Sequence, residues 1–157
     1  MAVTFSEQNQ KQIEDILSRY PTKQAALLPV LNLAQEEFGW ISQEVMQLVA
    51  ATLDLPLAHV YGVVTFYTMY HQKPIGRHCI EVCRTLSCAM MGSDKITQHI
   101  KNRLGIEIGE TTLDNRYTLL ETECLASCGT APAARVDGAY YENLTVDQLD
   151  GLLESLK

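Results

Sequence analysis

The sequence predicts an α+β protein in which an N-terminal helical bundle is followed by a smaller α/β domain. Two observations along its 157 residues support this division. Apolar residues recur at helical spacing up to about His71, whereas short alternating segments and a tight turn follow Gly76. The stretch from His71 to Gly76 marks the boundary between the two patterns. We therefore expect a helical N-terminal domain at residues 1–74 and a second domain at residues 75–157.

The first two predicted helices have clear start and stop signals. Ser6 can cap the first helix, and Pro21 ends it. Thr22 can cap the second helix, which Gly39 ends. Because Pro29 lies inside this second segment, it should either kink the helix or shift its start.

Two further helices complete the first half. Ser42 can cap the third helix, which is expected to run through Leu53. Pro56 suits the first turn of the fourth helix, which is expected to continue to about Thr65. The first half is therefore predicted to be entirely helical.

The second half combines strands with helices. In chain order we expect a strand at 78–83, a helix between Ser93 and Gly105, strands at 117–122, 133–136 and 139–141, and a last helix capped by Thr145. The dipeptide Asp137-Gly138 supplies a hairpin turn between the last two strands. The resulting order, β-α-β-β-β-α, is that of a small thioredoxin-like α/β domain.

Charge and composition argue against several classes of partner. The net charge is −7 and no run of Lys or Arg occurs, so neither nucleic acid nor an anionic membrane surface is an expected partner. No apolar stretch approaches the roughly 18 residues that a membrane helix needs, so no direct membrane insertion is expected. The first residues do not have the pattern of a signal peptide, and five cysteines without one indicate a reducing compartment. We therefore expect a cytoplasmic protein.

Four of the five cysteines form two short pairs that could hold a metal centre. Four residues separate Cys83 from Cys88, three separate Cys124 from Cys128, and 35 lie between the pairs. Each pair begins where a predicted strand ends, so both should emerge from the same end of the sheet. Four thiolates are the ligand count of a [2Fe–2S] cluster. Zinc sites usually have two residues between paired cysteines, so the spacing favours iron–sulfur, with a structural zinc module of four cysteines as an alternative.

The fifth cysteine, Cys79, competes with Cys83 for a place in such a site. If residues 78–83 are extended, the four residue-to-residue steps from Cys79 to Cys83 span about 13 Å, which is too far for both sulfurs to reach one small cluster. Cys79 is therefore expected to be a buried thiol that packs like a small apolar side chain. A thiol oxidoreductase that uses one cysteine pair is a further alternative, although its usual motif has two residues between the cysteines.

Motifs in both halves resemble one known family. They are CRTLSC at 83–88, MGSD at 91–94, LGI at 104–106, GETT at 109–112, ECLASC at 123–128 and AP at 131–132, with GWI at 39–41 and YGVVTFYTMY at 61–70. Together they are similar to the E-subunit family of NADH–quinone oxidoreductase, the small thioredoxin-like [2Fe–2S] subunit of respiratory complex I. Related subunits serve NAD-linked hydrogenases and formate dehydrogenases. The resemblance covers about residues 10 to 155.

The resemblance implies a function and a set of ligands. One [2Fe–2S] cluster would be bound by four thiolates, those of Cys83, Cys88, Cys124 and Cys128. The cluster would exchange single electrons with FMN in a larger flavoprotein subunit, which would also bind NADH. This chain alone would catalyse nothing, in agreement with its lack of a common nucleotide-binding motif. The fold analogy also predicts a cis peptide bond before Pro132.

The resemblance leaves the host complex open. The host would be NADH:quinone oxidoreductase, with this chain peripheral on the inner face of a bacterial membrane. An NAD-linked hydrogenase or a formate dehydrogenase is the alternative.

Overall fold

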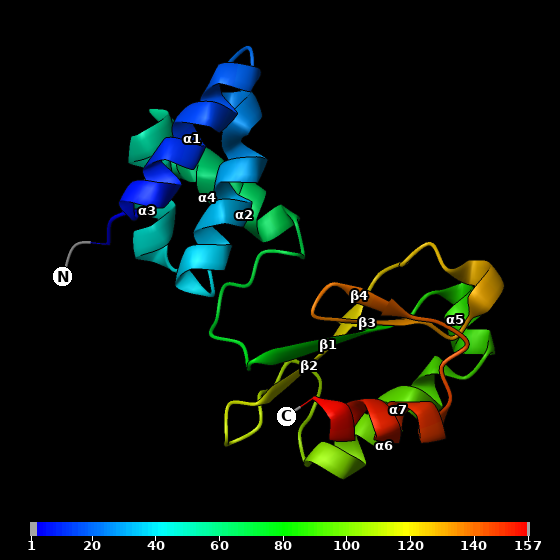
Figure 1. Cartoon of the computed structure of the whole chain (residues 1–157). Helices are drawn as coiled ribbons and strands as arrows, with labels where there is room; N and C mark the ends of the chain where they lie inside the picture. The colour runs from blue at the N-terminus through cyan, green and yellow to red at the C-terminus, as the bar shows by residue number, and fades with distance from the viewer. Residues whose placement is uncertain (1–2, 157) are drawn as a thin grey trace. The chain divides into compact units, whose positions relative to one another are not determined.

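The computed structural model describes residues 3–156 and divides the chain into two compact units. One unit ends at Pro74 and the other begins at Ile75 (Figure 1). Within the described residues, no helix combines the length and the apolar character needed to cross a membrane.

The first unit is helical throughout. Its elements are α1 (Glu7–Arg19), the 3-10 turn η1 (Gln24–Ala26), α2 (Leu27–Phe38), α3 (Gln43–Leu53) and α4 (Leu57–Phe66). The predicted caps of α1 and α3 are confirmed, because the hydroxyl of Ser6 accepts from the N–H of Asn9 and that of Ser42 from the N–H of Val45. Pro29 is the third residue of α2, so its effect is to shift the start of that helix rather than to kink it.

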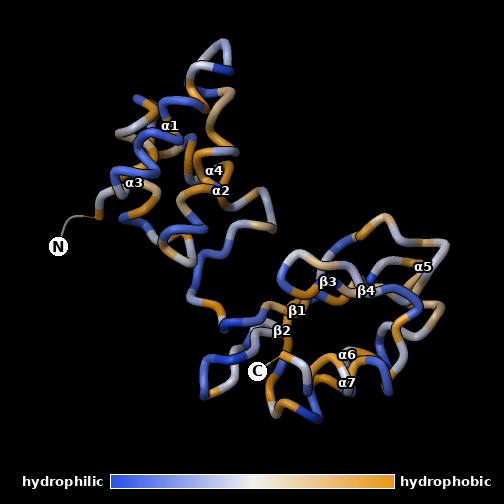
Figure 2. Tube along the Cα trace, in the orientation of Figure 1, coloured by the Kyte–Doolittle hydropathy of each residue, from blue (hydrophilic) through white to orange (hydrophobic). Residues whose placement is uncertain are grey.

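The core of this unit comes from one apolar face of each helix. Its fully buried members include Leu31, Val49, Leu53, Val60 and Val64. In Figure 2 the helices of the unit change repeatedly between hydrophilic and hydrophobic colours along the chain, as amphipathic helices do.

The second unit is a four-stranded sheet with helices. Its elements are β1 (His78–Cys83), α5 (Leu86–Met90), α6 (Ser93–Leu104), β2 (Tyr117–Thr122), the 3-10 turn η2 (Cys128–Thr130), β3 (Ala134–Val136), β4 (Ala139–Tyr141) and α7 (Val146–Ser155). The strand order is β2-β1-β3-β4, with β1 parallel to β2 and the other neighbours antiparallel. The α+β class is confirmed, and the predicted β-α-β-β-β-α order holds with α5 and η2 as additions.

Helices α6 and α7 cover one face of this sheet (Figure 1). Ile80 from β1, Leu119 from β2, Ile100 from α6 and Leu149 from α7 are completely buried in the resulting core. The predicted cis bond is present between Ala131 and Pro132.

Both edges of the sheet are defined by short segments. Residues 109–112 pair with the outer side of β2, since the N–H of Gly109 donates to the carbonyl of Leu119 at 2.7 Å and the N–H of Leu119 donates to the carbonyl of Glu110 at 3.1 Å. At the opposite edge, β4 is three residues long. The sheet therefore has one edge already paired and one that is very short.

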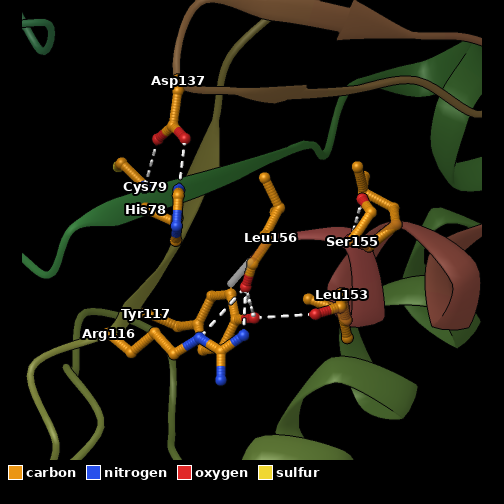
Figure 3. Close-up of polar contacts among 9 residues, drawn as sticks. His78, Cys79, Arg116, Tyr117, Asp137, Leu153, Ser155 and Leu156 are labelled. Atoms are coloured by element: carbon orange, nitrogen blue, oxygen red, sulfur yellow. Dashed lines mark hydrogen bonds and ion pairs between the residues drawn. The ribbon is translucent and has the colours of Figure 1, made fainter.

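Two polar networks join the second unit's elements at one end of β1 and β2 (Figure 3). The carboxylate of Asp137, in the β3–β4 turn, accepts from the N–H of Cys79 at 2.8 Å and contacts His78 Nδ1 at 2.6 Å. The hydroxyl of Tyr117 lies 2.8 Å from the carbonyls of Leu153 and Leu156, and the guanidinium of Arg116 also donates to the carbonyl of Leu156.

Candidate metal centre

The cysteine pairs follow β1 and β2 at the same end of the sheet. Because the two strands are parallel and Cys83 pairs with Thr122, the chain leaves both strands at the same end of the sheet, as predicted. Cys88 lies in the short helix α5. Cys124 lies two residues beyond the end of β2, and Cys128 begins η2.

The second pair has the spacing of two ligands on one metal ion. The sulfurs of Cys124 and Cys128 are 3.9 Å apart. Two thiolates on a tetrahedral metal ion, with metal–sulfur bonds of about 2.3 Å, lie about 3.8 Å apart. The N–H of Ala126 donates to the sulfur of Cys124 at 3.3 Å, and Ala126 itself has a left-handed φ of 60°. The loop between the pair thus turns tightly around its first sulfur.

The first pair is buried. Cys83 is 2% exposed and Cys88 3%, and they form a small core with Leu125, Ala131 and Ala133. The N–H of Leu125 donates to the sulfur of Cys83, and the N–H of Ala133 donates to that of Cys88. Residues that follow β2 therefore complete the surroundings of the pair that follows β1.

Hydrogen bonds and burial change the pKa values of three of the site thiols. Burial raises the pKa of Cys83, but hydrogen bonds from Thr85 and from the N–H of Leu125 outweigh it and lower that pKa overall. The N–H of Ala126 is the main reason that the pKa of Cys124 is lowered. Burial raises the pKa of Cys88. Since the thiolate is the form that binds metal, the donors around Cys83 and Cys124 favour the ligating state.

The donor set fits a cluster with two metal ions. Within residues 3–156, no three His, Cys, Asp or Glu side chains gather around a point that would suit a single ion. The sulfurs of Cys124 and Cys128 form one close pair, and Cys83 and Cys88 are buried together in one small core. A [2Fe–2S] cluster is held in this way, with two protein ligands on each iron.

Cys79 lies at the other end of β1, where its backbone N–H binds Asp137. Its thiol is buried, and burial raises its pKa to about 12. Such a thiol is almost never ionised near neutral pH, so it is a poor ligand and a poor nucleophile.

An exposed ion pair joins the two chain segments that leave the sheet. Arg84 follows Cys83 and Glu123 precedes Cys124, and the guanidinium Nη2 lies 2.5 Å from the carboxylate Oε1. The N–H of Arg84 also donates to the carbonyl of Thr122 at 3.1 Å. Both contacts fasten the starts of the segments that carry the cysteines.

Sequence reasoning found the four cysteines but missed the hydrogen-bond donors around them. Ala126 gives no signal, because alanine seldom adopts a left-handed conformation and nothing in the sequence marks the turn. Thr85 lies at the N-cap of α5, a position that threonine favours, but α5 itself was not predicted. A capping pattern directly after Cys83 was the signal that could have revealed it.

Comparisons with known proteins identify the family. The family described as thioredoxin-like [2Fe–2S] ferredoxin matches residues 13–157. The E subunit of NADH-quinone oxidoreductase from Rickettsia bellii is 39% identical over 157 residues, which cover 98% of this chain and 94% of that protein. The chain belongs to the NADH-quinone oxidoreductase E-subunit family of thioredoxin-like [2Fe–2S] ferredoxins. The resemblance noted from the motifs is therefore confirmed.

Other relatives match at similar levels. The E 2 subunit of NADH-quinone oxidoreductase from Rhizobium meliloti is 40% identical over 147 residues, covering 94% of this chain and 88% of that one. NADH dehydrogenase [ubiquinone] flavoprotein 2, mitochondrial, of Dictyostelium discoideum is 40% identical over 156 residues, which are 98% of this chain and 63% of that protein. Membership of the family supports an iron–sulfur cluster as the cofactor.

A solved structure shares the fold. The crystal structure of NAD+-reducing [NiFe]-hydrogenase in the air-oxidized state contains a chain that superposes with a TM-score of 0.73 at 23% identity. The superposition covers 83% of this chain and 22% of the hydrogenase chain. The fold of the E-subunit family thus occurs there as part of a much longer polypeptide.

Proposed function

We propose that this chain is the electron-transfer subunit of a multi-subunit NADH-oxidising complex of the NADH:quinone oxidoreductase type. It holds one [2Fe–2S] cluster through Cys83, Cys88, Cys124 and Cys128. The observation that supports the proposal is that both cysteine pairs follow parallel strands at one end of the sheet, with the sulfurs of the second pair 3.9 Å apart, in a chain of the E-subunit family.

The cluster exchanges single electrons with FMN in a larger flavoprotein subunit that also binds NADH. We place the host complex on the inner face of a bacterial membrane, with this chain peripheral and on the cytoplasmic side. Residues 1–74 form a helical domain, and residues 75–157 form the domain that carries the cluster. An equivalent subunit of an NAD-linked hydrogenase or a formate dehydrogenase is the alternative.

The chain's own part is to bind the cluster, orient it and limit its exposure to water. When bound, a [2Fe–2S] cluster accepts and releases one electron at a time. The N–H groups of Leu125, Ala126 and Ala133 donate to the cysteine sulfurs and offset the negative charge of the bound thiolates. The small core around Cys83 and Cys88 keeps water from one side, while Cys124 and Cys128 remain on the open side.

Apolar side chains beside the site support docking of a partner. Leu86 and Met90, at the two ends of α5, are 76% and 78% exposed, and the adjacent Met91 is 63% exposed. Exposed apolar side chains gathered at one place typically mark a protein interface. A flavoprotein seated here would lie next to Cys88 and could bring its FMN near the cluster.

Spectra and metal content of the full chain, purified without oxygen, test the cluster assignment. We expect a red-brown protein with two irons per chain, whose visible bands bleach on reduction with dithionite. Replacing any of the four cysteines by serine should lower the affinity for the cluster, which is measured as iron retained per chain. The loss should exceed the roughly 10–100-fold loss in metal affinity that is typical of changes to residues that only support the ligands. The Cys79→Ala variant is the matched control and should keep its iron.

Two results would count against the proposal. A colourless protein with stoichiometric zinc would identify the four-cysteine zinc module instead, and a colourless metal-free dithiol would point to thiol chemistry. Co-purification from the source cells then decides the host, because a flavoprotein with bound FMN and quinone reductase activity supports the complex I type. Hydrogenase or formate dehydrogenase subunits in its place would identify the alternative.

A further inference from the structure

The hydroxyl of Thr85 lies beside the first cysteine pair. Its Oγ1 is 3.3 Å from the sulfur of Cys83. Hydrogen bonding from the Thr85 side chain also contributes to the lowered pKa of Cys124. The contact between Thr85 and Cys83 lies within the segment that leaves β1.

This hydroxyl is not used for the local contact that its position favours. Thr85 occupies the N-cap of α5 with an extended backbone, at φ −81° and ψ 169°. A threonine at this position usually accepts a hydrogen bond from an N–H in the first turn of its helix. Among the residues that the structure describes, the Thr85 side chain accepts no such bond, and only its carbonyl receives one, from the N–H of Ala89. The hydroxyl contacts the sulfur of Cys83 instead.

The backbone of Thr85 is held independently of its side chain. Its N–H also donates to the sulfur of Cys83, and the carbonyl contact with Ala89 fixes the start of α5. A variant that lacks only the hydroxyl should therefore keep the local chain path. The contribution of the hydroxyl can be isolated by substitution.

We propose that Thr85 is a positioning residue whose hydroxyl donates to the sulfur of Cys83 and raises the reduction potential of the cluster that the cysteines hold. This inference rests on the proposed function, because it requires a bound [2Fe–2S] cluster. Reduction adds negative charge to the cluster and its ligands, and a hydrogen-bond donor stabilises that charge more strongly than it stabilises the oxidised form. The proton stays on the Thr85 oxygen, and the electron comes from the reductant.

Redox titration of the loaded full chain tests this role. Thr85→Val removes the hydroxyl at nearly constant shape, Thr85→Ala removes it with less bulk, and Thr85→Ser keeps it. The control is Thr65→Val, since the Thr65 hydroxyl donates to the carbonyl of Tyr61 within α4 and belongs to the other unit. Dithionite titrations followed by visible absorption and by electron paramagnetic resonance give the midpoint potential of each variant.

We expect Thr85→Val and Thr85→Ala to titrate at more negative potentials than wild type, and Thr85→Ser and Thr65→Val to titrate with it. If neither hydroxyl-free variant holds iron while Thr85→Ser does, the hydroxyl is needed to assemble the site, which also supports the proposal. Equal potentials in all loaded variants would overturn it, and so would a shift in Thr85→Ser as large as that in Thr85→Val. A wild-type chain that binds no iron would instead refute the proposed function.

Discussion

The two cysteine pairs differ in what fixes them in place. Cys83 ends a central strand and Cys88 lies in a helix, and both are buried against Leu125, Ala131 and Ala133. Cys124 and Cys128 are exposed, and the turn between them depends on a left-handed alanine. The sheet and its small core therefore hold one side of the site, whereas the other side is held by local hydrogen bonds. A bound cluster would contribute most to order on the second side.

The largest expected difference between the two cysteine pairs is in the rate of thiol labelling of the metal-free protein. At neutral pH we expect Cys124 and Cys128 to react with iodoacetamide at least about 100-fold faster than Cys83 and Cys88. The buried thiols react only after a local opening that costs roughly 3 kcal/mol or more. Peptide mass spectrometry over a time course measures each rate.

Cys79 serves as an internal control in the same experiment. Its pKa of about 12 means that at pH 9 only about one thiol in a thousand is ionised, so it should stay unlabelled longest as pH rises from 7 to 9. Equal labelling rates for all four site cysteines would remove the distinction between a preformed and a loosely held pair.

Substitution of Ala126, in the turn between Cys124 and Cys128, should change the free energy of unfolding by a moderate amount. Glycine adopts a left-handed φ without strain, so Ala126→Gly should raise the free energy of unfolding by about 1 kcal/mol. Valine is strained there, and Ala126→Val should lower it by about 1–2 kcal/mol. Urea unfolding of the metal-free protein measures both.

The matched control for the two Ala126 substitutions is Ala139→Gly, which changes an exposed position in β4. Glycine within a strand should destabilise by about 0.5–1 kcal/mol, the opposite sign to Ala126→Gly. Destabilisation by glycine at both positions would show that the turn in the second pair is not strained in solution.

The smallest expected effect concerns Glu142, whose carboxylate fastens the segment after Cys128. It accepts from the hydroxyl of Thr130 at 2.6 Å, and hydrogen bonds from Thr130 and Ser127 lower its pKa below the usual 4.5. A carboxyl with a lowered pKa stabilises the folded state above its unfolded pKa, and that stability is lost as pH falls through the folded value. Wild type should therefore melt slightly above Glu142→Gln at pH 7.

Thermal unfolding at several pH values measures this difference. Because Glu142 is exposed, we expect about one degree or less at pH 7, and the difference should disappear as pH falls below the lowered pKa of Glu142. The Glu121→Gln variant is a suitable comparison, since it makes a similar change to an acidic residue before Cys124. A difference between wild type and Glu142→Gln that persists unchanged in acid would mean that the charge of Glu142 is not its cause.

The positions of the cysteines could be predicted because strand direction decides them. A helix between two strands of one sheet makes those strands parallel. The chain after Cys83 and the chain after Thr122 therefore had to leave at the same end of the sheet. Helix α5 was not predictable in the same way, because five residues contain too little of a helical period. The turn at Ala126 is set by the surrounding hydrogen bonds and not by the preference of alanine.

The paired outer edge of β2 has a consequence for how any partner can bind. Many proteins recognise each other by adding a strand to a free sheet edge, with main-chain hydrogen bonds as the main source of affinity. Here residues 109–112 already occupy one edge, and β4 offers three residues at the other. Strand addition is thus poorly supported in the described part of this chain, and the same short edges protect the sheet from aggregation. The proposed docking at α5 would then depend on side chains, so replacing Leu86 or Met90 by a charged residue should weaken it.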